Sequence, residues 1–90
     1  LLERTAYAMN ADSIRQMIET GFEKAGLPGA RAEVQGEDGV HFEATVVSEA
    51  FAGKLPLARH RMVYATLGEK MGGEIHALQL RTVTPAEAAA

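Results

Sequence analysis

An Asp-Gly step between two short alternating runs is the feature that most restricts how this chain can fold. Residues 36–39 read Gly-Glu-Asp-Gly, and an Asp-Gly pair in such a position is the strongest short-range signal for a β-hairpin. Residues 31–35 form a strand pattern before it, and residues 41–47 alternate apolar and polar side chains after it. The pattern predicts an antiparallel hairpin with a firm register, because a one-residue slip would turn Phe42 outward.

A helical pattern precedes the hairpin. Five apolar residues recur at helical spacing, namely Ile14, Met17, Ile18, Phe22 and Ala25. Asn10 or Asp12 can cap the first turn, and Gly26 is expected to end the helix. Gly21 lies inside the apolar stripe, where it costs about 1 kcal/mol relative to alanine unless another element packs closely against it.

A second helix and a third strand follow the hairpin. Residues 48–53 predict one loose helical turn, and Pro56 suits the first turn of a helix over residues 57–71. The apolar stripe of that helix comprises His60, Val63, Tyr64, Leu67 and Met71. Residues 75–83 predict a strand, after which Thr84 and Glu87 form the capping pair of a terminal helix.

This order predicts an α+β domain, αββαβ(α), with a three-stranded mixed sheet and the helices packed on one face. The connection between the second and third strands should be a right-handed crossover, which makes those strands parallel. Residues 1–9 are expected to be a disordered leader or an expression remnant, and residues 10–90 a single domain.

Composition excludes several classes of function. The chain has no cysteine, so disulfides, thiol catalysis and metal sites built from its own thiolates are excluded. A net charge of -3 argues against nonspecific coating of nucleic acid. No run resembles a membrane span or a signal peptide, so we expect a cytoplasmic protein. Ser13 and Ser48 have no catalytic partners in the pattern, and we expect no enzyme activity.

Two segments carry the residues with the most distinctive chemistry. Lys54, Arg59 and Arg61 occur together with no acidic residue between Ala50 and Gly68. His76 lies in an otherwise strand-like run. We expect the basic helix start to lie beside the strand histidine, forming a site for an anionic or metal-bearing partner. Arg59 and Arg61 are about 200° apart on a helix, so we expect one to face a partner and the other to brace the fold.

A set of short motifs resembles the BolA family, in particular its short-loop, IbaG-like branch. The matching segments are His41-Phe42, Ser48, Phe51-x-Gly53-Lys54, Leu57-x-Arg59-His60-Arg61-x-Val63-Tyr64-x-x-Leu67, Ile75-His76-Ala77 and Thr82-x-Thr84-Pro85-x-Glu87. The resemblance implies a fold like a class II KH domain. The chain lacks the Gly-x-x-Gly loop of true KH domains, and Ala88 stands where the family carries an aromatic residue, which predicts a short or weakly docked terminal helix.

The resemblance also implies a partner and a cofactor. Members of the family pair with monothiol glutaredoxins and share a [2Fe–2S] cluster, for which the histidine at the place of His76 is a ligand. No cluster is expected on the chain alone, because glutaredoxin and glutathione would supply the thiolates. An imidazole can replace thiolate on one iron of such a cluster. The alternative for His76 is a half-buried strand histidine bonded to a backbone carbonyl.

The remaining candidates have two interpretations each. His41 is either a second cluster ligand or a solvated residue at the start of a strand, and Asp38 is a less suitable donor because carboxylates prefer harder cations. His60 is either a ligand or a core histidine beside Tyr64, and we expect the core histidine because it lies on the apolar stripe.

Lys54, Arg59 and Arg61 are expected either to contact glutathione carboxylates, an acidic glutaredoxin surface or DNA phosphates, or to form a solvated helix start. The alternative function implied by the resemblance is a DNA-binding transcriptional regulator of cell shape and stress response. We expect a monomer or a weak homodimer joined at a sheet edge.

Overall fold

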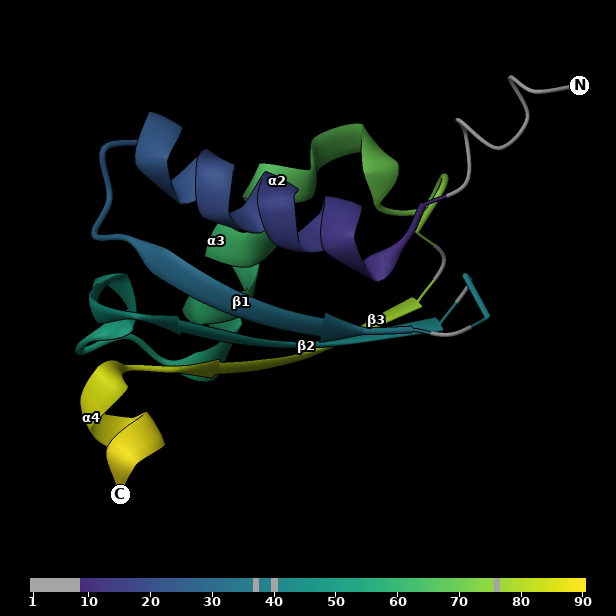
Figure 1. Cartoon of the computed structure of the whole chain (residues 1–90). Coiled ribbons are helices and arrows are strands. Elements are labelled where there is room, and N and C mark those ends of the chain that lie inside the picture. Colours follow the sequence, from purple (N-terminus) through teal and green to yellow (C-terminus); the bar gives the residue numbers. More distant parts are fainter. Residues whose placement is uncertain (1–8, 37, 40, 76) are drawn as a thin grey trace, which may run out of the picture.

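The computed structural model describes residues 9–36, 38–39, 41–75 and 77–90, and its element order confirms the predicted α+β class (Figure 1). The elements are α2 (Ala11–Lys24), β1 (Ala30–Gln35), β2 (His41–Ser48), α3 (Pro56–Leu67), β3 (Ala77–Val83) and α4 (Pro85–Ala89). Short 3-10 turns occupy Glu49–Phe51 and Gly68–Lys70. No helix in the described part of the chain is long and apolar enough to cross a membrane.

The sheet has the strand order β1-β2-β3, with β2 in the centre. β1 and β2 pair antiparallel, with Ala32 opposite Val46, which confirms the predicted hairpin. β2 and β3 pair parallel, with Phe42 opposite Leu78, as expected for strands joined through a helix. Phe42 is only 1% exposed, so the register places this ring in the core.

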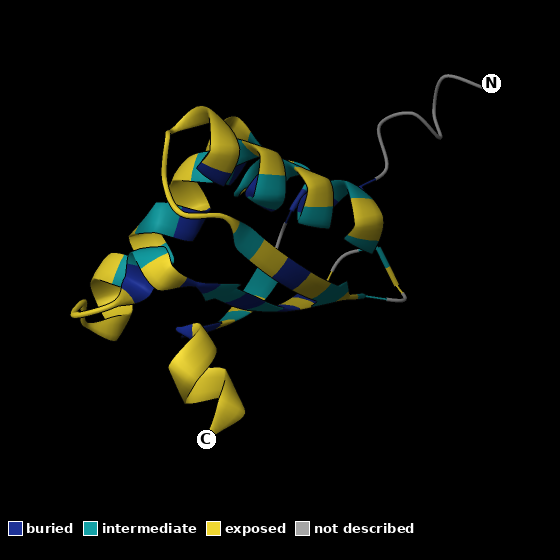
Figure 2. Ribbon diagram, turned by 60° about the vertical axis from the view of Figure 1, so that its left-hand side comes forward, coloured by how far each residue is buried: buried dark blue, intermediate teal, exposed yellow. Residues whose placement is uncertain are grey.

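Helices α2 and α3 cover one face of the sheet, while α4 lies beyond the end of β3 on the other side (Figure 1). The buried sides of α2 and α3 turn toward the sheet, and their outer sides are exposed (Figure 2). A Cβ added at Gly21 would lie 2.6 Å from the Cβ of Thr66. This close approach of α2 and α3 confirms the condition under which a glycine is tolerated inside the apolar stripe.

The second helix differs from the prediction in its length and its orientation. It ends at Leu67 instead of residue 71, because Gly68 adopts a φ of 52°, in the left-handed region. Val63 and Leu67 are its buried residues. Tyr64 is 37% exposed, and the ring of half-buried His60 meets it edge-to-face at 6.5 Å. His60 is therefore half-buried against Tyr64 at the edge of the core, and the prediction of a fully buried core histidine is wrong.

Met9 corrects the predicted domain boundary. Its side chain is 9% exposed and packs in the core cluster that includes Ile14, Phe42 and Ile75. The next residue, Asn10, caps α2 by accepting a 2.8 Å hydrogen bond from the backbone N–H of Ser13. Met9 therefore belongs to the folded domain, and the leader prediction for residues 1–8 concerns residues outside the described part of the chain.

Candidate functional site

One end of the sheet carries the candidate ligand His41. His41 is the first residue of β2, and its partner across the parallel ladder is Ala77, the residue that follows His76 in the sequence. His76 itself lies outside the described residues, so its role as a ligand stays a prediction. A pocket of about 450 Å³ occupies this end of the sheet and is lined by Gln35, Gly36, Asp38, His41, Phe42, Glu43, Ala77 and Gln79.

Asp38 and His41 are joined by two hydrogen bonds across the hairpin turn. The backbone N–H of His41 donates to Oδ1 of Asp38 at 2.9 Å. The ring Nδ1 of His41 lies 2.8 Å from Oδ2 of the same carboxylate. The side chain of His41 is 73% exposed and that of Asp38 is 56% exposed, so the imidazole is accessible to solvent and to a partner.

The donors at this end do not form a metal site within the described part of the chain. The chain has no cysteine, and the described residues contain no group of three His, Cys, Asp or Glu side chains able to hold a metal ion. The chain can therefore offer imidazole nitrogen and carboxylate oxygen to a metal ion, but no thiolate.

Arg59 is committed to contacts within the chain. Its guanidinium donates to the backbone carbonyls of Lys54 at 2.8 Å and Thr82 at 3.1 Å, and to both carboxylate oxygens of Glu87 at 2.7 and 3.1 Å. The side chain is 12% exposed and lies 6.0 Å from the ring centre of Phe51. Arg59 therefore has the bracing role expected for one of the two arginines. Its guanidinium is occupied within the chain and is not offered to a partner.

Lys54 and Arg61 are both exposed and remain available to a partner. Two exposed leucines flank them, Leu55 at 78% and Leu57 at 62% exposure. No acidic residue occurs between Ala50 and Gly68 in a chain with a net charge of -3, so the charged side chains of this stretch are all basic, and of these Arg59 is paired with Glu87.

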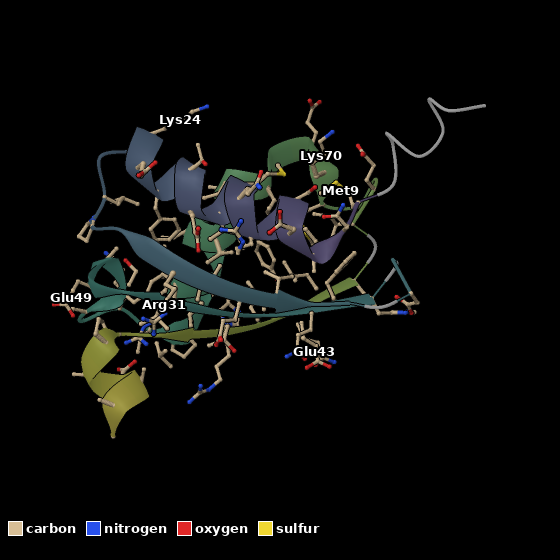
Figure 3. All side chains as sticks on the ribbon, in the orientation of Figure 1. Met9, Lys24, Arg31, Glu43, Glu49 and Lys70 are labelled. Carbon is tan, nitrogen blue, oxygen red and sulfur yellow. The ribbon has the colours of Figure 1, made fainter. Side chains whose placement is uncertain are left out.

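The basic surface and the histidine end lie apart, which contradicts the expectation of one combined site. His41 begins β2, whereas Lys54 follows the end of that strand, whose eight residues rise about 3.3 Å each. Arg59 contacts Thr82 near the end of β3, while Ala77 begins that strand. His41 and Ala77 thus lie at the amino ends of two parallel strands, and the basic helix start lies near the carboxyl ends of those strands. Figure 3 shows Glu49, which follows β2, at the opposite end of the molecule from Met9.

Two of these interactions were not found by reasoning from the sequence. The Arg59–Glu87 pair joins residues 28 positions apart, and the capping motif indicated only the local partner of Glu87. The Asp38–His41 bonds could have been predicted from the sequence, because an Asp in a turn commonly accepts a hydrogen bond from a backbone N–H two or three residues later.

Comparison with known proteins places these features in a family. The family model described as BolA-like protein matches residues 19–87. BolA-like protein 1 of Homo sapiens is 39% identical over 83 residues, covering 82% of this chain and 60% of the human protein. The DNA-binding transcriptional regulator BolA of Vibrio cholerae is 53% identical over 47 residues, covering 52% of this chain and 44% of that protein.

A solved structure agrees with the sequence comparisons. The structure of a bolA protein homologue from Coxiella burnetii superposes with a TM-score of 0.78 at 41% identity, covering 91% of this chain and 99% of that one. The chain spans about 60% or less of the two curated relatives. The family match over most of the chain, together with this fold, shows that the chain belongs to the BolA-like family.

Proposed function

We propose that this chain is a cytoplasmic accessory protein that shares a [2Fe–2S] cluster with a monothiol glutaredoxin and helps to hold, transfer or sense that cluster, in connection with stress response. The observation that supports the proposal is the exposed imidazole of His41, which pairs in the sheet with the residue next to His76, in a chain without any thiol. His76 is the proposed iron ligand, and His41 is the proposed second donor.

The proposed division of ligands has a chemical consequence. When bound, a cluster with imidazole on one iron has a higher reduction potential than one held by thiolates alone. This chain would hold the imidazoles at the amino ends of β2 and β3, while the partner and glutathione supply the thiolates.

We propose that the chain is a monomer without its partner. The backbone N–H of Ala32, on edge strand β1, donates to the Glu19 carboxylate at 3.0 Å. Glu19 thereby occupies one of the backbone donors that a second copy would need for pairing at this edge.

Co-expression with a monothiol glutaredoxin tests the shared cluster. We expect the two proteins to co-purify with iron and acid-labile sulfide in equal amounts, whereas this chain expressed alone should carry neither. Purification of the two proteins as separate, colourless species under anaerobic conditions would argue against the proposal.

A DNA-binding regulator is the second candidate. Lys54 and Arg61 are exposed with no acidic residue near them in the sequence, and the V. cholerae relative is named a DNA-binding transcriptional regulator. Binding through phosphate contacts should weaken steeply as salt concentration rises. Titration of the chain with duplex DNA at several salt concentrations tests this candidate, and no binding at low salt excludes it.

A further inference from the structure

We propose that Asp38 is a positioning residue that holds His41 in the tautomer with the proton on Nδ1, so that Nε2 is the nitrogen offered to iron. The inference rests on the proposed function, because it assigns an atom and a supporting residue to the second donor of the same site.

The hydrogen bonds determine which nitrogen is available. Both oxygens of Asp38 face His41, one toward its backbone N–H at 2.9 Å and the other toward Nδ1 at 2.8 Å. An ionised carboxylate can only accept hydrogen bonds. The neutral ring must therefore carry its proton on Nδ1, which leaves the lone pair on Nε2.

The turn holds the carboxylate in place for this task. The backbone bond from His41 fixes one oxygen of Asp38, so the second oxygen is directed at the ring of the same residue. His41 also belongs to the β2 ladder, where it pairs with Ala77. The donor and the acceptor are thus both fixed by the hairpin, while the side chain of His41 remains 73% exposed and accessible to a partner.

This arrangement is the one that metal-binding histidines use. A ligating imidazole almost always donates its other N–H to a carboxylate, a carbonyl or water, and loss of that partner commonly reduces metal affinity 10- to 100-fold. A surface Asp–His pair contributes little to folding stability. The contact between Asp38 and the ring of His41 is therefore expected to act mainly on the chemistry of His41.

The substitution Asp38→Asn tests this role because it replaces one carboxylate oxygen, a hydrogen-bond acceptor, with an NH2 group, a hydrogen-bond donor. The amide oxygen can keep the bond from the His41 backbone, but the NH2 group then faces Nδ1. Nδ1 must become the acceptor, and the proton moves to Nε2. Nitrogen NMR of the labelled chain without glutaredoxin, at a pH where the imidazoles are neutral, should show Nδ1–H in the wild type and Nε2–H in the variant.

Glu43→Gln is the matched control. Glu43 lines the same pocket and makes no hydrogen bond to His41 among the described residues, so this variant should keep the Nδ1–H tautomer. The glutaredoxin complex then supplies the second readout. Asp38→Asn should lose its cluster to a chelator about 10-fold or more faster than the wild type and Glu43→Gln.

The outcomes separate this inference from the proposed function. An Nε2–H ring in the wild type, or an unchanged tautomer in Asp38→Asn, overturns the role of Asp38 and leaves the shared cluster intact. A switched tautomer with unchanged cluster loss overturns the assignment of Nε2 to iron. If the wild-type complex contains no cluster, the proposed function is contradicted, and with it the iron-binding half of this inference.

Discussion

Arg59 and Glu87 form a bidentate ion pair, with hydrogen bonds of 2.7 and 3.1 Å, that joins the first turns of α3 and α4 across 28 residues of sequence. Glu87 also closes the capping box of α4, in which its carboxylate accepts from the Thr84 backbone at 2.9 Å. These contacts lower the pKa of Glu87 from 4.5 to about 2. The hydrogen bond from Arg59 is the largest cause, and the hydrogen bond from the Thr84 N–H is the next largest.

The pair predicts a specific pH dependence of stability. A carboxyl group whose pKa is lowered by folding stabilises the native state above its ordinary pKa of 4.5, and this contribution is lost as pH falls toward about 2. We expect Glu87→Gln to flatten the dependence of unfolding free energy on pH in this window. Urea unfolding at a series of pH values measures the effect.

Glu23→Gln is the control for this prediction, since Glu23 is exposed and has no ion pair among the described residues. It should keep the wild-type pH profile. Parallel profiles for Glu87→Gln and the wild type would mean that the ion pair does not persist in solution.

Gly21→Ala should destabilise the protein although alanine is the better helix former. The new Cβ would lie 2.6 Å from both Cβ and Cγ2 of Thr66. Such overpacking usually costs about 1–3 kcal/mol, which exceeds the gain of about 1 kcal/mol in helix propensity. Chemical denaturation should show a net loss, and Thr66→Gly in the same chain should recover part of it.

Gly29→Ala is the matched control, because a Cβ at Gly29 meets no heavy atom within 4 Å. Its unfolding free energy should stay within about 0.5 kcal/mol of the wild type. A stabilising Gly21→Ala substitution would contradict the close crossing of α2 and α3.

Gly36→Ala should disturb the hairpin beneath the histidine end. A Cβ at Gly36 would overlap the ring of Phe42 and lie 2.8 Å from the carbonyl oxygen of His41. We expect a loss of about 1–3 kcal/mol in unfolding free energy. Amide chemical shifts should change most around Asp38 and His41, and changes confined to the distant end of the sheet would contradict the close packing.

Charge reversal at the exposed cations tests the DNA-binding candidate. Lys54→Glu with Arg61→Glu should weaken binding to duplex DNA and reduce the slope of log affinity against log salt by about 2. Lys24→Glu, a change at an exposed lysine near the end of α2, is the control and should have a smaller effect. Equal weakening by both changes would point to a nonspecific charge effect.

Local signals in the sequence were sufficient for much of the fold. The Asp38-Gly39 step, the cap at Asn10 and the Thr84–Glu87 capping box each depend on residues close together in the chain, and the structure has all three. The orientation of α3 was missed because apolar residues occur on both of its faces, including exposed Leu57 and buried Val63.

The candidate site was less predictable than the fold. The separation of Lys54 from His41 depends on the length and direction of β2, which closeness in sequence does not reveal. The acceptors of the Arg59 guanidinium could not be assigned from sequence, because whether Arg59 braces the fold or faces a partner depends on Glu87, which is 28 residues away in the chain.

The most direct test of the shared cluster is the effect of His76→Ala on the glutaredoxin complex. Visible absorption and circular dichroism should be recorded for the wild type, for His76→Ala and for His60→Ala, whose ring instead packs against Tyr64. We predict that His60→Ala keeps the wild-type cluster spectrum and that His76→Ala alters or loses it. A His76→Ala complex with the wild-type spectrum and iron content would contradict the account.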